Sequence, residues 1–176
     1  MTSRNDKTTR IVIVAFFIAA EIVLTRYFSI MIAGEVRIGF GFLPVAMLAC
    51  MYGPLWAGAA YAIGDILGML IWPSGAFFPG FTLTAFLTGV VFGLFLYKKE
   101  VRWTNVLPAT LIICLGLNLG LDTLWLTILL KKGFLLLLPL RVFKCAVIIP
   151  VQLVLIPLVW HTVMKKIPYV KSLMAN

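Results

Sequence analysis

Residues 118–125 read Asn-Leu-Gly-Leu-Asp-Thr-Leu-Trp, and residues 138–144 read Leu-Pro-Leu-Arg-Val-Phe-Lys. An amide, a carboxylate, an indole and two cations therefore stand inside sequence that is otherwise apolar. On a helix, Asn118, Asp122 and Trp125 share one face, because they are four and then three positions apart. Charges at membrane depth are costly and normally face a bundle interior, a cavity or one another. We therefore interpret these two stretches as half of a binding pocket.

The composition predicts an integral membrane protein. Hydrophobic residues make up 62% of the 176-residue chain, whereas soluble domains contain about 45–50% apolar residues. The mean hydropathy is +1.09. The formal net charge of +9 raises the possibility of nucleic-acid binding. However, the basic residues stand at the ends of apolar runs, which is typical of membrane helices, so no nucleic-acid partner is predicted.

The apolar runs predict an all-α fold, a six-helix bundle forming a single transmembrane domain over residues 1–176. The second run contains two glycines and a proline and extends for only roughly 20 Å, short of the ~30 Å hydrocarbon core. Residues 29–38, before it, are expected to form a mixed loop. The predicted helices lie at about 11–28, 39–52, 55–72, 81–97, 106–130 and 138–163.

An even number of spans puts both termini on one side of the membrane. By the positive-inside rule that side is cytoplasmic, because it gathers Arg4, Lys7, Arg10, Lys98, Lys99, Arg102, Lys165, Lys166 and Lys171. The remaining cations fall at external helix ends or loops, and they are Arg26, Arg37, Lys131, Lys132, Arg141 and Lys144. An anionic ligand arriving from outside explains this exception. The alternative, for Lys131 and Lys132 above all, is that they extend to the membrane interface.

Carboxylates, aromatic rings and arginines together suit a ligand with a flat ring at one end and acids at the other. Asp122 or Asp65 can accept two hydrogen bonds from a ring with adjacent N–H donors, such as a pterin, and Asn118 can donate and accept. Arginine matches a carboxylate with two parallel hydrogen bonds. Stacking faces come from Trp125, Phe77 and Phe78. The alternative for Asp65 and Asp122 is a structural ion pair with Arg26, Arg141 or Lys144.

Catalysis and metal binding find no support in the sequence. The single histidine, His161, stands beside the cytoplasmic lysines, and no H-E-x-x-H, G-x-S-x-G or metal-ligand cluster is present. The three cysteines stand apart in apolar runs and are interpreted as packing residues. No Walker A sequence is present, so a chain of this kind needs a partner to move a ligand uphill.

Several segments resemble one family of membrane proteins, the folate-specific substrate-binding S components of energy-coupling factor (ECF) vitamin transporters. The resemblance covers residues 11–163. The segments that carry it are 37–44 (Arg-Ile-Gly-Phe-Gly-Phe-Leu-Pro), 64–68 (Gly-Asp-Ile-Leu-Gly), 79–85 (Pro-Gly-Phe-Thr-Leu-Thr-Ala), 122–126 and 138–144. The first helix also carries Ala15-x-x-x-Ala19, similar to the motif with which these subunits dock onto their scaffold.

The resemblance implies a multi-pass protein of the bacterial cell membrane that binds folate or a reduced folate at its external face. It further implies a complex with a transmembrane scaffold and two ATPases, which use ATP and Mg, so this chain itself carries no cofactor and is not an enzyme. The loaded subunit is expected to topple in the membrane to deliver its vitamin.

Three alternatives remain open at the level of sequence. The first is an S component for another flat vitamin such as riboflavin, which would leave the external cations unexplained. The second is a membrane enzyme acting on lipid or isoprenoid, which would need a nucleophile–base pair or metal ligands. The third is a structural subunit that binds no small molecule.

Overall fold

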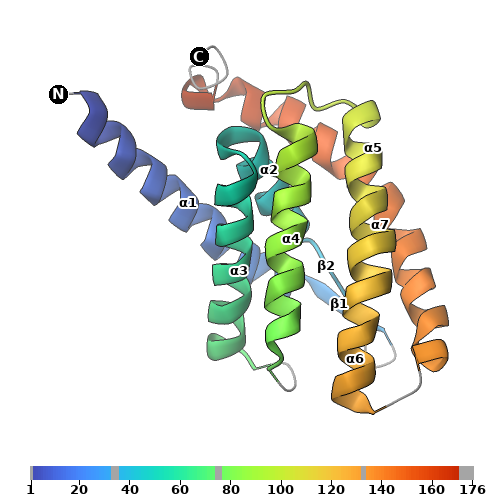
Figure 1. The fold of residues 1–176 in the computed structure, drawn as a ribbon. Helices are drawn as coiled ribbons and strands as arrows, with labels where there is room; N and C mark the ends of the chain where they lie inside the picture. The colour runs from blue at the N-terminus through green and yellow to red at the C-terminus, as the bar shows by residue number, and fades with distance from the viewer. Residues whose placement is uncertain (1, 33–35, 74–76, 132–133, 171–176) are drawn as a thin grey trace.

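The computed structural model describes residues 2–32, 36–73, 77–131 and 134–170, and most of them are helical (Figure 1). The longest elements are α1 (Thr2–Arg26), α3 (Pro54–Ile71), α4 (Pro79–Leu96) and α7 (Phe134–Thr162). Another long helix is continuous but changes its winding, from α5 (Trp103–Leu111) through the π-helix η1 (Ile112–Leu121) to α6 (Asp122–Leu130). The smaller elements are α2 (Phe42–Tyr52) and the 3₁₀ turn η2 (Met164–Lys166). The all-α class predicted from the sequence is confirmed.

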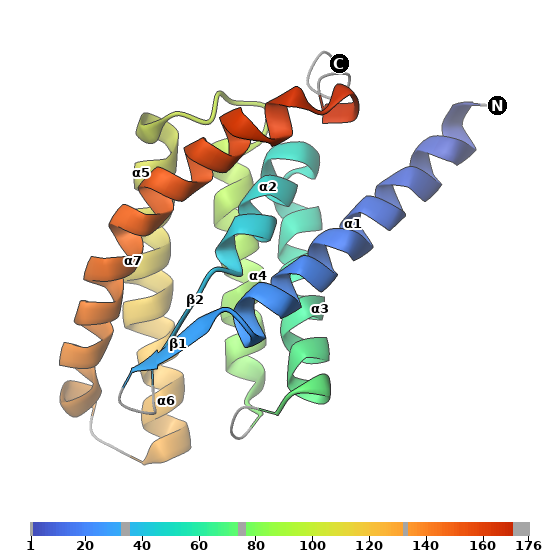
Figure 2. The same ribbon diagram turned by 180° about the vertical axis from the view of Figure 1, so that it is seen from behind.

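A small β-hairpin occupies part of the segment that the sequence predicted to be a loop. Its strands are β1 (Ser29–Ile32) and β2 (Val36–Gly39), which pair antiparallel with Ser29 opposite Gly39 and Met31 opposite Arg37. In Figure 2 the hairpin runs from the lower end of α1 across the bundle toward α7, and β2 contacts α7. The connection after α1 therefore reaches the opposite side of the molecule.

Within the described residues, five helical segments are long and apolar enough to cross a membrane, and the 11-residue α2 is an additional, shorter apolar helix. The predicted count of six crossings stays a prediction. The first helix begins at Thr2, well before the predicted start at Ile11, and the last begins at Phe134 instead of Leu138. Both ends of the described chain lie at the same end of the bundle, as does the α4–α5 connection (Figures 1 and 2).

The short helix α2 forms the centre of the core. Its residues from Pro44 to Tyr52 are all buried, and α2 contacts α1, α3, α4 and α7. Irregular or short backbone segments are tolerated at membrane depth only where protein or a water-filled cavity covers them. The surrounding helices supply that cover, so α2 need not span the hydrocarbon by itself.

Helices α3 and α4 pack at very short range through glycine. A Cβ added at Gly89 would lie 2.5 Å from the Ala57 carbonyl oxygen, and one added at Gly58 would lie 2.9 Å from that of Phe86. Small residues allow such close approach between membrane helices. This pair holds Asp65 on α3 and Thr84 on α4 in fixed register.

Candidate functional site

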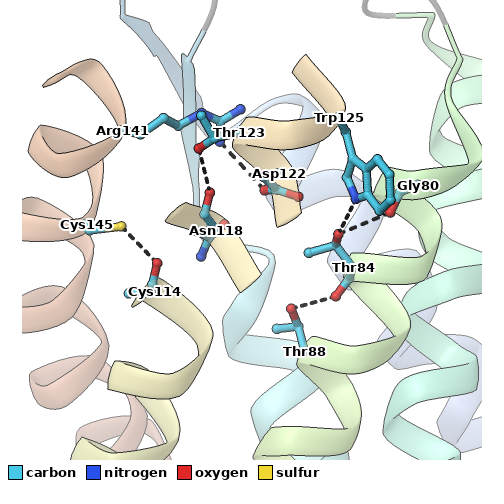
Figure 3. Close-up of polar contacts among 10 residues, drawn as sticks. All are labelled: Gly80, Thr84, Thr88, Cys114, Asn118, Asp122, Thr123, Trp125, Arg141 and Cys145. Atoms are coloured by element: carbon cyan, nitrogen blue, oxygen red, sulfur yellow. Dashed lines mark hydrogen bonds and ion pairs between the residues drawn. The ribbon is translucent and has the colours of Figure 1, made fainter. Parts of the chain in front are cut away.

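An ion pair joins the two sequence stretches that were predicted to form a pocket. Asp122 begins α6 and Arg141 lies on α7, with Arg141 Nη1 3.6 Å from Asp122 Oδ2 (Figure 3). Their exposed fractions are 9% and 5%. Among the described residues, Asp122 Oδ1 and Arg141 Nε have no hydrogen-bond partner. Since buried polar groups are normally satisfied, these two atoms are the candidates for contact with another molecule. The Asp122 carboxylate also lies within hydrogen-bonding range of the Thr84 side chain.

Aromatic rings lie beside this ion pair. Trp125 is on α6, one turn after Asp122, and its ring centroid lies 5.5 Å from that of Phe78, which precedes α4. A Cβ added at Gly80 would lie 2.6 Å from Trp125 Cδ2, so both rings pack directly against the first turn of α4. Phe77 is 53% exposed. Of the three aromatic residues predicted from the sequence, Phe78 and Trp125 are therefore in contact with each other.

Threonines of α4 hold the polar atoms around these rings. The indole N–H of Trp125 donates to Thr84 Oγ1 at 3.2 Å, and Thr84 Oγ1 donates to the Gly80 carbonyl at 3.1 Å (Figure 3). Thr82 Oγ1 donates to Asp65 Oδ2 at 2.7 Å, which links α4 to α3. Neither threonine was predicted as a site residue from the sequence. The one signal for them is that both lie in the segment 79–85, which carries the family resemblance.

Arg26 and Asp65 lie where α1 meets α3. A Cβ added at Gly68 would lie 3.0 Å from Arg26 Nε, so the guanidinium of Arg26 lies over that glycine. One turn earlier on α3, Gly64 packs in the same way against the carboxylate of Glu21. Two glycines of α3 thus accommodate two charged side chains of α1. Asp65 is hydrogen-bonded to Thr82 of α4 and lies within electrostatic range of both Glu21 at this junction and Asp122.

The remaining predicted binding residues have fewer described contacts. Lys144 is half-buried on α7, one turn after Arg141, and Asn118 is half-buried in η1. The backbone carbonyl of Asn118 accepts a hydrogen bond from Thr123 Oγ1 at 3.4 Å, so this contact does not involve the side-chain amide. Arg37 lies on β2, which contacts α7, but its side chain lies outside the described part of the structure.

The structure also describes the predicted docking residues and one of the two loop cations. Ala15 and Ala19 are both exposed on α1. Lys131 is exposed and ends α6 in the left-handed conformation, at a φ of 52°, whereas Lys132 lies outside the described residues. The described residues contain no group of three or more His, Cys, Asp or Glu that could hold a metal ion.

Comparisons with known proteins identify the family. A family model described as the substrate-specific component of ECF transporters matches residues 9–160. A protein of Clostridium novyi named folate transporter FolT is 45% identical over 157 residues, covering 89% of this chain and 91% of its own. A protein of the same name from Leuconostoc mesenteroides is 31% identical over 151 residues, covering 82% and 80%. A crystal structure of FolT bound with folic acid superposes with a TM-score of 0.77 at 35% identity, covering 83% of this chain and 89% of that one. The chain therefore belongs to the family of substrate-specific components of ECF transporters.

Proposed function

We propose that this chain is the high-affinity folate-binding subunit of an ATP-dependent ECF vitamin importer. The observation that carries the proposal is the buried Asp122–Arg141 pair, which offers a candidate acceptor and a candidate donor beside the Phe78–Trp125 ring pair. A carboxylate, a guanidinium and stacking rings are the complement of a pterin ring joined through an amide to carboxylates. The names of the C. novyi and L. mesenteroides relatives point to the same ligand.

The two ends of folate are assigned to different groups of residues. Asp122 or Asp65, together with Asn118, accepts and donates hydrogen bonds at the pterin ring, which stacks against the aromatic residues. The cations serve the acidic end or the amide. The ring group is Asp65, Phe77, Phe78, Asn118, Asp122 and Trp125, and the acid group is Arg26, Arg37, Arg141 and Lys144. Because Arg141 Nη1 lies 3.6 Å from Asp122 Oδ2, the two groups meet at this pair, and Arg141 serves a part of the ligand close to the ring.

The importer that this subunit serves consists of further proteins. Because the chain has no Walker A sequence, ATP and Mg are used by two partner ATPases on a transmembrane scaffold. The exposed Ala15 and Ala19 on α1 form the small-residue face that docks on that scaffold. Toppling of the loaded subunit in the membrane then delivers folate to the inside.

Removing the Arg141 side chain tests the proposal. The Arg141→Ala variant should bind folate roughly 2–5 kcal/mol more weakly than the native chain, because one partner of a buried charge pair is lost. The measurement is isothermal titration calorimetry of the detergent-purified protein. Tryptophan fluorescence, corrected for absorbance by folate, serves as the second readout.

Arg102→Ala is the matched control, because Arg102 is exposed and forms an ion pair with Glu100, which is exposed too. It should bind folate as the native chain does. Riboflavin and thiamine are titrated in parallel. Saturable binding of riboflavin in place of folate would keep the family and replace the ligand, whereas unchanged folate affinity in Arg141→Ala would remove Arg141 from the site.

A further inference from the structure

The indole nitrogen of Trp125 is already engaged within the protein. Its N–H donates to Thr84 Oγ1 across the α4–α6 contact, over a sequence separation of 41 residues. An indole has a single N–H donor and no acceptor. Trp125 can therefore offer a ligand only its ring face and edge, while its polar atom is held by α4.

Thr84 is itself fixed in the orientation that this contact needs. Its hydroxyl donates to the Gly80 carbonyl, four residues earlier, and its oxygen accepts the hydrogen bond from the indole N–H. The Asp122 carboxylate lies within hydrogen-bonding range of the same hydroxyl. Threonine adopts two rotamers in helices, and one of them allows this hydrogen bond to the carbonyl of the preceding turn. Thr84 is 4% exposed, so water does not compete freely for the hydroxyl.

The surroundings of the indole restrict it further. The Phe78 ring lies against Trp125 with a tilt of 43° between the planes. At Gly80, the position that a Cβ would take is 2.5 Å from Phe78 Cε1 and 2.6 Å from Trp125 Cδ2. With the glycine surface on one side and Phe78 beside it, the hydrogen bond to Thr84 determines how the indole is rotated.

We propose that Thr84 is a positioning residue, whose hydroxyl fixes the rotamer of Trp125 so that the ring face is presented for stacking. This inference rests on the proposed folate function. It means that Thr84 contributes to binding of the pterin ring indirectly, through Trp125, without contacting the ligand. Pre-organisation of this kind raises affinity because the ring need not be ordered when the ligand binds.

The test compares Thr84→Val, which keeps the shape and removes the hydroxyl, with Thr84→Ser, which keeps the hydroxyl. Thr84→Val should weaken binding of folate and of a free pterin about tenfold, and should leave p-aminobenzoylglutamate, which lacks the ring, unchanged. Thr84→Ser should restore most of the loss. In the ligand-free protein, the fluorescence emission of Trp125 should shift to shorter wavelength in Thr84→Val. The emission of Trp125 is obtained by subtracting the spectrum of the same protein that also carries Trp125→Phe.

Thr88→Val is the matched control, because Thr88 Oγ1 donates to the Thr84 carbonyl at 2.8 Å one turn further along α4. It removes a buried hydroxyl from the same helix, and it should leave both folate affinity and Trp125 emission unchanged. If the native chain binds folate and Thr84→Val binds it equally well, the positioning role is overturned and the folate function stands. If the native chain binds no folate, the folate function fails, and the emission shift alone decides whether Thr84 orients the indole.

Discussion

Asp122 is the residue at which ligand binding and internal ion pairing make different predictions. As a ring acceptor it offers two carboxylate oxygens, whereas asparagine offers only one acceptor oxygen. Asp122→Asn should therefore weaken folate binding by ~1.5–3 kcal/mol, the value of a hydrogen bond to a charged group. Binding of p-aminobenzoylglutamate should fall much less. Calorimetry with both ligands provides the measurement.

Asp65→Asn is the comparison variant, since Asp65 is the other candidate acceptor and is already hydrogen-bonded to Thr82. Loss of folate affinity in Asp65→Asn alone would mean that the pterin ring binds to Asp65 on α3 and not to Asp122. A third result is that Asp122→Asn lowers the thermal stability and leaves folate affinity intact. In that case the Asp122–Arg141 pair is only a structural ion pair, as the sequence also allowed.

The sequence predicted individual polar residues better than it predicted their partners. Asp122 and Arg141 could be named because a charge inside apolar sequence at membrane depth is costly and implies a partner. Thr84 could not be named, since threonine is common in apolar helices and can bond to its own backbone. Its contact with Trp125 depends on how α4 and α6 pack, and no local pattern encodes that arrangement. The roles assigned to the binding residues stay predictions.

At the scale of elements, the contact between α3 and α4 sets the geometry on which the site depends. Gly89→Ala should destabilise the protein by about 1–3 kcal/mol, the usual cost of overpacking. The added methyl group would meet backbone atoms of Ala57 and Gly58, and backbone atoms cannot move aside as a flexible side chain can. A lower melting temperature in detergent is the expected result.

Gly116→Ala is the matched control for this substitution, because an added Cβ at that position of η1 would meet nothing within 4 Å. Its stability should stay within about 0.5 kcal/mol of the native value. Equal melting temperatures for Gly89→Ala and the native chain would mean that α3 and α4 do not pack as closely as in the structure.

Element types were predictable where hydrophobic runs were long, and less so where the backbone is irregular. The sequence correctly indicated that the second helix is short, because Gly39, Gly41 and Pro44 interrupt its run. It did not predict the hairpin β1–β2, whose strands are each only four residues long. It also did not predict the π-helix η1, because no periodicity in the sequence marks the change in winding.

At the scale of the whole molecule, family membership confirms the prediction of a transporter subunit rather than an enzyme. The family and the five long apolar helices together make the chain a multi-pass bacterial membrane protein. Both termini of the described chain and the α4–α5 connection lie at one end of the bundle, and the last turn of α6 lies at the opposite end (Figure 1). The orientation of these ends in the membrane stays a prediction from the distribution of cations.

Labelling of introduced cysteines tests that orientation. Lys131 and Lys99 are both exposed. Lys131 follows α6 and Lys99 follows α4, and these two helix ends lie at opposite ends of the bundle in Figure 1. The native Cys50, Cys114 and Cys145 are buried. In intact cells, a membrane-impermeant maleimide should label Lys131→Cys, and it should label Lys99→Cys only after the membrane is permeabilised. The native chain, with its buried thiols, gives the baseline signal.

Each pattern of labelling has a definite meaning for function. The Asp122–Arg141 pair lies on the helices that the α6–α7 connection joins, so labelling of Lys131→Cys from outside would place the candidate site where a vitamin arrives. The reverse pattern would turn the site toward the cytoplasm, and uptake by this subunit would then need a different site. Labelling of both variants from outside would show that the chain crosses the membrane an even number of times between residues 99 and 131. That result would contradict the single crossing by the continuous helix from α5 to α6, and with it the six-crossing topology.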